Sequence, residues 1–215
     1  MKGEKKYSVV RENLLEWYDK NKREYPWRNT TNLYQILITE ILLQKTIASN
    51  VRALYEDFFQ KYKDFSAIYE SSITSLQSDI KSLGLSKKRS KTLKDLSEMI
   101  ISNFKGKIPG DPIVLKEING IAEYVSNAYA CFGLNRRTLF YDVNIKRIIE
   151  RVFEISTNGN KNEFVNEQLD MLLPHNDCKH FYWALLDFGS IICAKKNPKC
   201  QICPISDSCH YFLII

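Results

Sequence analysis

Four cysteines near the end of the chain restrict its fold more than any other feature of the sequence. Cys193, Cys200, Cys203 and Cys209 follow the spacing C-x6-C-x2-C-x5-C, which puts four thiols within seventeen residues. Four thiolates this close indicate a metal site, and both structural zinc and an iron–sulfur cube accept such ligands. The uneven spacing favours a chain that wraps around a cluster larger than one ion.

The rest of the sequence is typical of a cytoplasmic protein. The chain begins with Met-Lys-Gly-Glu-Lys-Lys and has no apolar core of a signal peptide, and no run of eighteen apolar residues could span a membrane. Cysteines in such a protein point to metal binding or reactivity rather than disulfides. Cys131, in an apolar helix outside the four-cysteine pattern, is expected to be a core residue. The net charge of +6 favours an anionic partner without proving one.

Helical periodicity accounts for most of the chain. Only eight glycines and six prolines in 215 residues indicate long regular elements. The sequence predicts an all-α fold of about ten helices joined by short loops, and the one short strand candidate is 137–141. The expected helical patterns cover 1–24, 33–43, 51–62, 68–80, 87–104, 143–153, 162–173 and 181–192.

One carboxylate lies inside the most apolar of these helices. The segment 33–43 is apolar almost all round, which predicts a buried central helix, and Glu40 lies within it. A buried carboxylate costs several kcal/mol unless it is paired, neutralised or used. Glu40 is therefore either satisfied by amides of a neighbouring helix or part of a functional pocket.

A glycine turn and a single acid form the central pattern of the sequence. Residues 115–132 read as two short helices joined by a turn at 118–122, where Gly120 permits a tight backbone. The free amides at the start of the second helix can hold a phosphate. About twenty residues later, Asp142 precedes the helical segment 143–153. Taken alone, Asp142 is a favourable N-cap.

A further charged feature precedes the glycine turn in the sequence. Residues 83–86 read as a helix stop followed by a new cap, with Ser86 as the capping residue. Lys87, Lys88 and Arg89 follow it, so they oppose the dipole of the new helix. Such cations indicate either a nearby anion or an ordinary exposed face.

The turn, the later aspartate and the cysteine tail together resemble the helix-hairpin-helix DNA glycosylases of the endonuclease III superfamily, over nearly the whole chain. Tyr-Pro-Trp-Arg at 25–28 and Ile-Thr-Glu-Ile-Leu-Leu-Gln-Lys-Thr at 38–46 are similar to the branch that contains adenine-mismatch and archaeal thymine-mismatch glycosylases. The resemblance implies a six-helix lobe at 30–136 and a second lobe built from 1–29 and 137–215. It also implies DNA bent across a cleft and a [4Fe–4S] cluster on the four cysteines that serves structure and DNA binding.

The resemblance also implies roles for individual residues. Asp142 matches the catalytic aspartate, which stabilises positive charge on the sugar of a flipped nucleotide and orients water. Glu40 matches the pocket glutamate, which hydrogen-bonds the base or protonates it as it leaves. Gln44 and Lys45 are candidates to fill the gap left by that base, although ordinary surface polarity explains them equally well. Gly120 and Ala122 belong to the phosphate-binding hairpin.

Position 124 separates the subfamilies. Bifunctional members carry a lysine there, and adenine-mismatch enzymes a small residue, whereas this chain has Tyr124, as in the thymine-mismatch enzymes. Tyr124 packs against the base or sugar, or is simply a core tyrosine. The chain ends six residues after Cys209, so no domain that reads oxidised guanine is expected. Ala122 stands where the family hairpin has its second glycine, and would be strained if that position needs positive φ.

We therefore expect a monomeric, monofunctional glycosylase that acts on double-stranded DNA and removes thymine or uracil opposite guanine. Three alternatives remain open at this point: an adenine-mismatch glycosylase without its extra domain, a glycosylase for a modified pyrimidine, and a non-catalytic DNA-binding module. No membrane association is expected.

Overall fold

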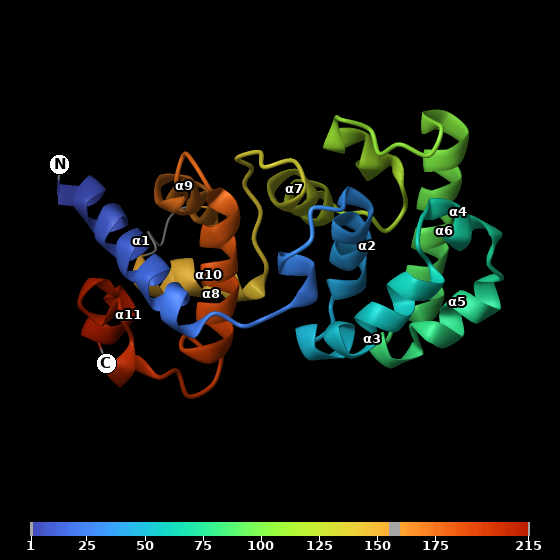
Figure 1. Ribbon diagram of the computed structural model, residues 1–215. Coiled ribbons are helices and arrows are strands. Elements are labelled where there is room, and N and C mark those ends of the chain that lie inside the picture. Colours follow the sequence, from blue (N-terminus) through green and yellow to red (C-terminus); the bar gives the residue numbers. More distant parts are fainter. Residues whose placement is uncertain (1, 155–159, 215) are drawn as a thin grey trace. The chain divides into compact units, whose positions relative to one another are not determined.

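The computed structural model describes residues 2–154 and 160–214, and these are helical with no β-strand (Figure 1). This confirms the all-α expectation. The chain divides into two compact units, one formed by residues 24–134 and the other by residues 1–23 and 135–215. Among the described residues, no helix combines the length and the apolar character needed to cross a bilayer.

The unit formed by residues 24–134 is built around α2 (Leu33–Leu43). This helix is buried on nearly every side, as its all-apolar sequence predicts, and it packs against α3, α6 and α7. α4 and α5 cover α6 (Figure 1). Its other elements are η1 (Pro26–Arg28), α3 (Ala48–Lys61), α4 (Phe65–Glu70), α5 (Ile73–Asp79), η2 (Lys81–Leu83), α6 (Ser86–Phe104), η3 (Pro112–Glu117) and α7 (Glu123–Phe132).

The other unit joins the two ends of the chain. The N-terminal α1 (Lys2–Asn21) packs on α9 (Lys161–Leu172) and α10 (Cys178–Ile191), and α10 packs on α8 (Val143–Val152). The buried carboxylate of Asp187 in α10 accepts hydrogen bonds from the backbone N–H and the side chain of Arg23, at 2.9 and 2.7 Å. The short elements η4 (Cys200–Ile202), η5 (Ser206–Ser208) and α11 (His210–Leu213) form the cysteine-bearing tail.

Two local expectations were wrong. The pattern at 68–80 is two helices, because Ser71 is extended and the hydroxyl of Ser72 accepts from the amide of Ser75, which starts α5 anew. The N-cap of α6 is Leu85 in the left-handed region at φ +51°, and not Ser86, which is the first helical residue.

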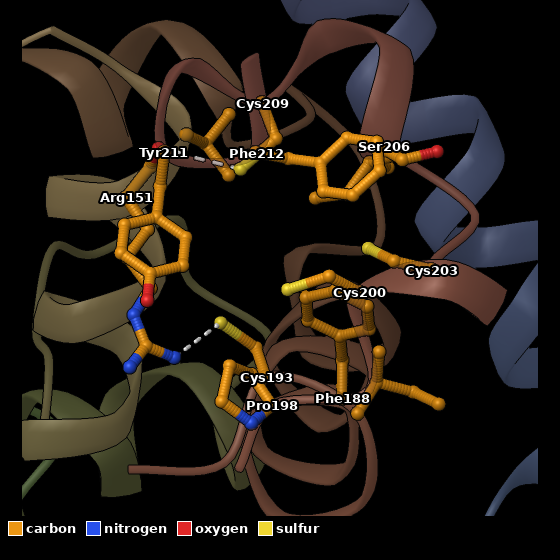
Figure 2. Close-up of a pocket in the computed structure, with 13 residues that line it drawn as sticks. Arg151, Phe188, Cys193, Pro198, Cys200, Cys203, Ser206, Cys209, Tyr211 and Phe212 are labelled. Atoms are coloured by element: carbon orange, nitrogen blue, oxygen red, sulfur yellow. Dashed lines mark hydrogen bonds between the residues drawn. The ribbon is translucent and has the colours of Figure 1, made fainter. Parts of the chain in front are cut away.

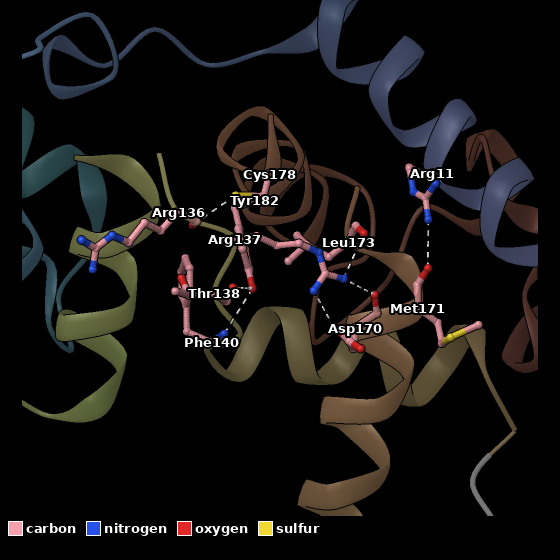
Figure 3. A network of polar contacts seen from close by, with 10 residues as sticks. All are labelled: Arg11, Arg136, Arg137, Thr138, Phe140, Asp170, Met171, Leu173, Cys178 and Tyr182. Carbon is pink, nitrogen blue, oxygen red and sulfur yellow. Dashed lines mark hydrogen bonds and ion pairs between the residues drawn. The ribbon is translucent and has the colours of Figure 1, made fainter. Parts of the chain in front are cut away.

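The expected strand at 137–141 is also absent from the described residues. This extended stretch bonds to side chains rather than to a second strand (Figure 3). The hydroxyl of Tyr182 accepts from the amide of Phe140 at 3.1 Å and donates to the carbonyl of Thr138 at 2.8 Å. Arg137 pairs with Asp170 at 2.7 Å. These contacts fix the path of the chain that leads to Asp142.

Candidate functional site

Asp142 is the N-cap of α8. Its Oδ1 accepts from the backbone amides of Asn144 and Ile145 at 2.9 and 2.8 Å, and its Oδ2 accepts from the side-chain amide of Asn144 at 2.7 Å. Asp142 is therefore an N-cap, as the sequence predicts. Each carboxylate oxygen has about two acceptor positions, so capping leaves acceptor capacity on Oδ2 for a further group.

A chain of polar contacts leads from this aspartate to the cysteine-bearing tail. The Oδ1 of Asn144 accepts from Arg147 at 2.9 Å, and Arg147 donates to the backbone carbonyls of Cys193 and Gly189 at 2.9 and 2.8 Å. Asn144 and Arg147 were not among the functional residues predicted from the sequence. Their signal was available, because polar residues recur at 144, 147 and 151, a spacing that places them on one face of the helix.

The four cysteines of the tail line one pocket (Figure 2). Their sulfur atoms border the same space, which amounts to about 340 Å³ including some open solvent. The rest of the lining is largely apolar, and Arg151 donates to the sulfur of Cys193 at 3.4 Å. Burial raises the pKa of the Cys203 thiol to about 11 and also raises that of Cys209. No three His, Cys, Asp or Glu side chains among the described residues are grouped to hold a single metal ion.

The hairpin contains the one glycine that its geometry demands. Gly120 has φ +100°, and a Cβ there would lie 2.1 Å from Oγ1 of Thr92. Thr92 donates to the carbonyl of Asn119 at 3.0 Å, which anchors the turn to α6. Ala122 has φ −75° and ψ 165°, so the alanine that departs from the family pattern is not strained. The first half of the hairpin is the 3₁₀ helix η3 rather than an α-helix.

The end of α2 is joined to this hairpin. The side-chain amide of Gln44 donates to the carbonyl of Gly120 at 3.0 Å. Lys45, the next residue, is exposed and has φ +52°, a left-handed conformation that is unusual for a residue with a side chain. The structure therefore brings two of the sequence-predicted DNA-binding segments together.

Glu40 is buried within α2, with 5% of its surface exposed. Burial raises the pKa of this carboxyl group to about 8, although the charge of Arg28 opposes the shift. Tyr124 is half-buried on the first turn of α7, after the hairpin.

The class of fold to which these features belong is given by comparison with known proteins. Residues 38–175 match the family model described as "HhH-GPD superfamily base excision DNA repair protein". The chain belongs to this superfamily.

Its relatives are DNA glycosylases by name. The chain is 36% identical to the thymine/uracil-DNA glycosylase of Methanothermobacter thermautotrophicus, over 97% of this chain and 95% of that protein. It is 29% identical to the adenine DNA glycosylase of Mycobacterium tuberculosis, over 90% of this chain and 64% of the relative. The solved structure of a thermostable thymine-DNA glycosylase superposes with a TM-score of 0.91 at 35% identity, and 98% of each chain is covered.

Proposed function

We propose that this protein is a base-excision DNA glycosylase that hydrolyses the N-glycosidic bond of a flipped thymine or uracil opposite guanine in double-stranded DNA. The observation that carries the proposal is the 36% identity to a thymine/uracil-DNA glycosylase along nearly the full length of both chains. Tyr124 supports a monofunctional reaction, because the position that holds an amine nucleophile in bifunctional relatives has none here.

Asp142 is the proposed catalytic residue. Breaking the bond between base and sugar develops positive charge on the deoxyribose, and a fixed carboxylate beside that sugar stabilises it. The bonds from the amides of α8 and from Asn144 hold the Asp142 side chain in one orientation. Its remaining acceptor capacity suits a water molecule that attacks the sugar.

Glu40 and Tyr124 are proposed to contact the flipped nucleotide. With a pKa of about 8, Glu40 is protonated at neutral pH and can donate a hydrogen bond or a proton to the departing base. Tyr124 follows the hairpin directly, where an aromatic ring can pack against the base or the sugar.

The hairpin and the end of α2 are the proposed DNA-binding segments. Gly120 and Ala122 lead into α7, whose first amides have no helical acceptors and so suit a phosphate. Gln44 and Lys45 are proposed to fill the gap that the base leaves. Flipping costs a few kcal/mol and least for a mispair, which gives one physical source of mismatch selectivity.

Cys193, Cys200, Cys203 and Cys209 are proposed to hold a [4Fe–4S] cluster. The donor set fits, because four thiols border one pocket with apolar walls and the cation of Arg151 contacts one sulfur. Such a cluster, when bound, supplies structural cross-linking of the tail rather than the chemistry of bond cleavage. Iron content and visible absorption of the purified protein distinguish a cluster from a single zinc ion.

An adenine-mismatch activity is the second candidate, because the chain is also 29% identical to an adenine DNA glycosylase. One panel separates the two functions: duplexes with G·T, G·U or A·8-oxoguanine, each incubated with the protein and analysed with and without hot alkali. We expect strand breaks at T and U only after alkali, since alkali cleaves the abasic site that a monofunctional enzyme leaves. Breaks opposite 8-oxoguanine alone would favour the adenine activity.

The variant Asp142→Asn tests the catalytic assignment in the same panel. Asparagine is also a good N-cap, so α8 should stay folded and mismatch binding should persist while base release is lost. Release at the wild-type rate would refute the role of Asp142, and no release from any duplex by the wild type would refute the proposed function.

A further inference from the structure

An arginine buried in α6 makes contacts that neither the hairpin nor the proposed chemistry accounts for. Only 4% of the surface of Arg89 is exposed. Its guanidinium donates to the carbonyls of Ile41 at 3.3 Å and Gln44 at 2.7 Å, and also to the carbonyl of Gly84. In the described part of the chain no carboxylate pairs with it, so carbonyl dipoles alone balance this buried charge.

Two of these carbonyls lie at the C-terminus of α2, where the partial charge of the helix is negative. Arg89 therefore caps α2 from another helix. The planar guanidinium offers five N–H donors in a fixed arrangement, so it holds several carbonyls at defined angles, which the single ammonium of lysine does not.

The turn that follows α2 is not in a relaxed conformation. Lys45 has φ +52°, and a residue with a Cβ in this region is strained relative to the right-handed conformation. The turn is held from two sides: Arg89 binds the carbonyl of Gln44, and the Gln44 side chain binds the carbonyl of Gly120. Without the hydrogen bond from Arg89 to the Gln44 carbonyl, one of the two restraints that hold Lys45 in its strained conformation is lost.

We propose that Arg89 is a positioning residue for base flipping: it presets the Gln44–Lys45 turn in the conformation that enters the duplex. This inference rests on the proposed function, because it assumes that the turn fills the gap left by the base. Arg89 then acts on the step that opens the base pair and not on cleavage of the glycosidic bond.

The test compares Arg89→Lys with wild type on two substrates. One is a duplex with a single uracil opposite guanine, and the other has the same uracil in a bubble of unpaired bases, where no base pair must open. Single-turnover release from the duplex should slow about 10-fold or more, which corresponds to losing a hydrogen bond from a charged group. Release from the bubble should stay within about twofold of wild type, because no pair must open there.

Arg11→Lys is the matched control. Arg11 likewise donates to carbonyls at the end of a helix, those of Leu172 at 2.7 Å and Met171 at 2.9 Å, and it lies in the other unit (Figure 3). This variant should leave both rates unchanged. If Arg89→Lys slowed duplex and bubble equally, or slowed neither, the proposed role of Arg89 would be overturned.

A second pair of variants keeps the inference testable if Arg89→Lys fails to fold. Lys45→Asn and Lys45→Val both remove the charge, but asparagine tolerates the left-handed region and the β-branched valine does not. The valine variant should release uracil from the duplex about 10-fold more slowly than the asparagine variant, and at the same rate from the bubble. Equal rates on the duplex would contradict the inference. A wild-type protein that releases no uracil from either substrate would refute the proposed function, and this inference with it.

Discussion

Replacing Glu40 by glutamine should stabilise the folded protein increasingly as the pH rises. Folding raises the pKa of Glu40 from 4.5 to about 8, chiefly because burial penalises the charged form. Between these two values the folded state binds more protons than the unfolded state, so the free energy of unfolding falls as the pH rises. Glutamine has nearly the same shape and does not titrate, so this pH dependence should disappear in the variant.

The size of the effect follows from the shift. One pKa unit corresponds to about 1.4 kcal/mol, so from pH 4.5 to pH 7 the wild type should lose about 3 kcal/mol of stability relative to Glu40→Gln. The comparison between two pH values matters more than the absolute stability of the variant, because any change in packing by the amide is the same at both. Urea unfolding curves at several pH values between 4.5 and 8 measure the difference.

Glu16→Gln on the exposed face of α1 is the control. Its hydrogen bond with Lys20 lowers the pKa of Glu16, so its contribution has the opposite sign: stability present at neutral pH and lost in acid. Parallel profiles of unfolding free energy against pH for wild type and Glu40→Gln across the window would refute the burial argument.

In the base-release assay, the wild-type rate should fall as the pH rises through about 8, and this decrease should be missing in Glu40→Gln.

Three further outcomes are expected. Gly120→Ala should lower the melting temperature, because φ is +100° and the new Cβ would lie 2.1 Å from Oγ1 of Thr92. Adding Thr92→Ala should recover part of the lost stability, and no recovery would mean that the strain lies in the backbone alone. Tyr124→Lys should add strand nicking without alkali, and a folded variant that releases the base but never nicks would contradict the assigned position. Cys203→Ser should reduce bound iron, whereas Cys178→Ser, which loses a thiol outside the pocket, should not.

Long-range contacts explain why some functional residues could not be predicted from the sequence. In the sequence, Arg89 is one of three basic residues in the first turn of a helix. In the structure it is buried, whereas Lys87 and Lys88 are exposed. Nothing local separates these three, because the carbonyls that Arg89 binds at Ile41 and Gln44 lie more than forty residues away. The link from Asn144 and Arg147 to the cysteine tail is hidden for the same reason.

Local chemistry was enough for the features that depend on neighbours in sequence. The apolar run 33–43 predicted α2 to the residue, because a segment without a polar face must be buried whatever surrounds it. The cap at Asp142, the glycine at position 120 and the spacing of four thiols are also local. Only the tertiary structure decided that burial raises the pKa of Glu40, that Lys45 is held in a strained turn and that Ala122 is not strained. Burial, strain and the resulting pKa shifts depend on which residues pack around a side chain in space. The neighbours of that residue in the sequence do not determine this packing.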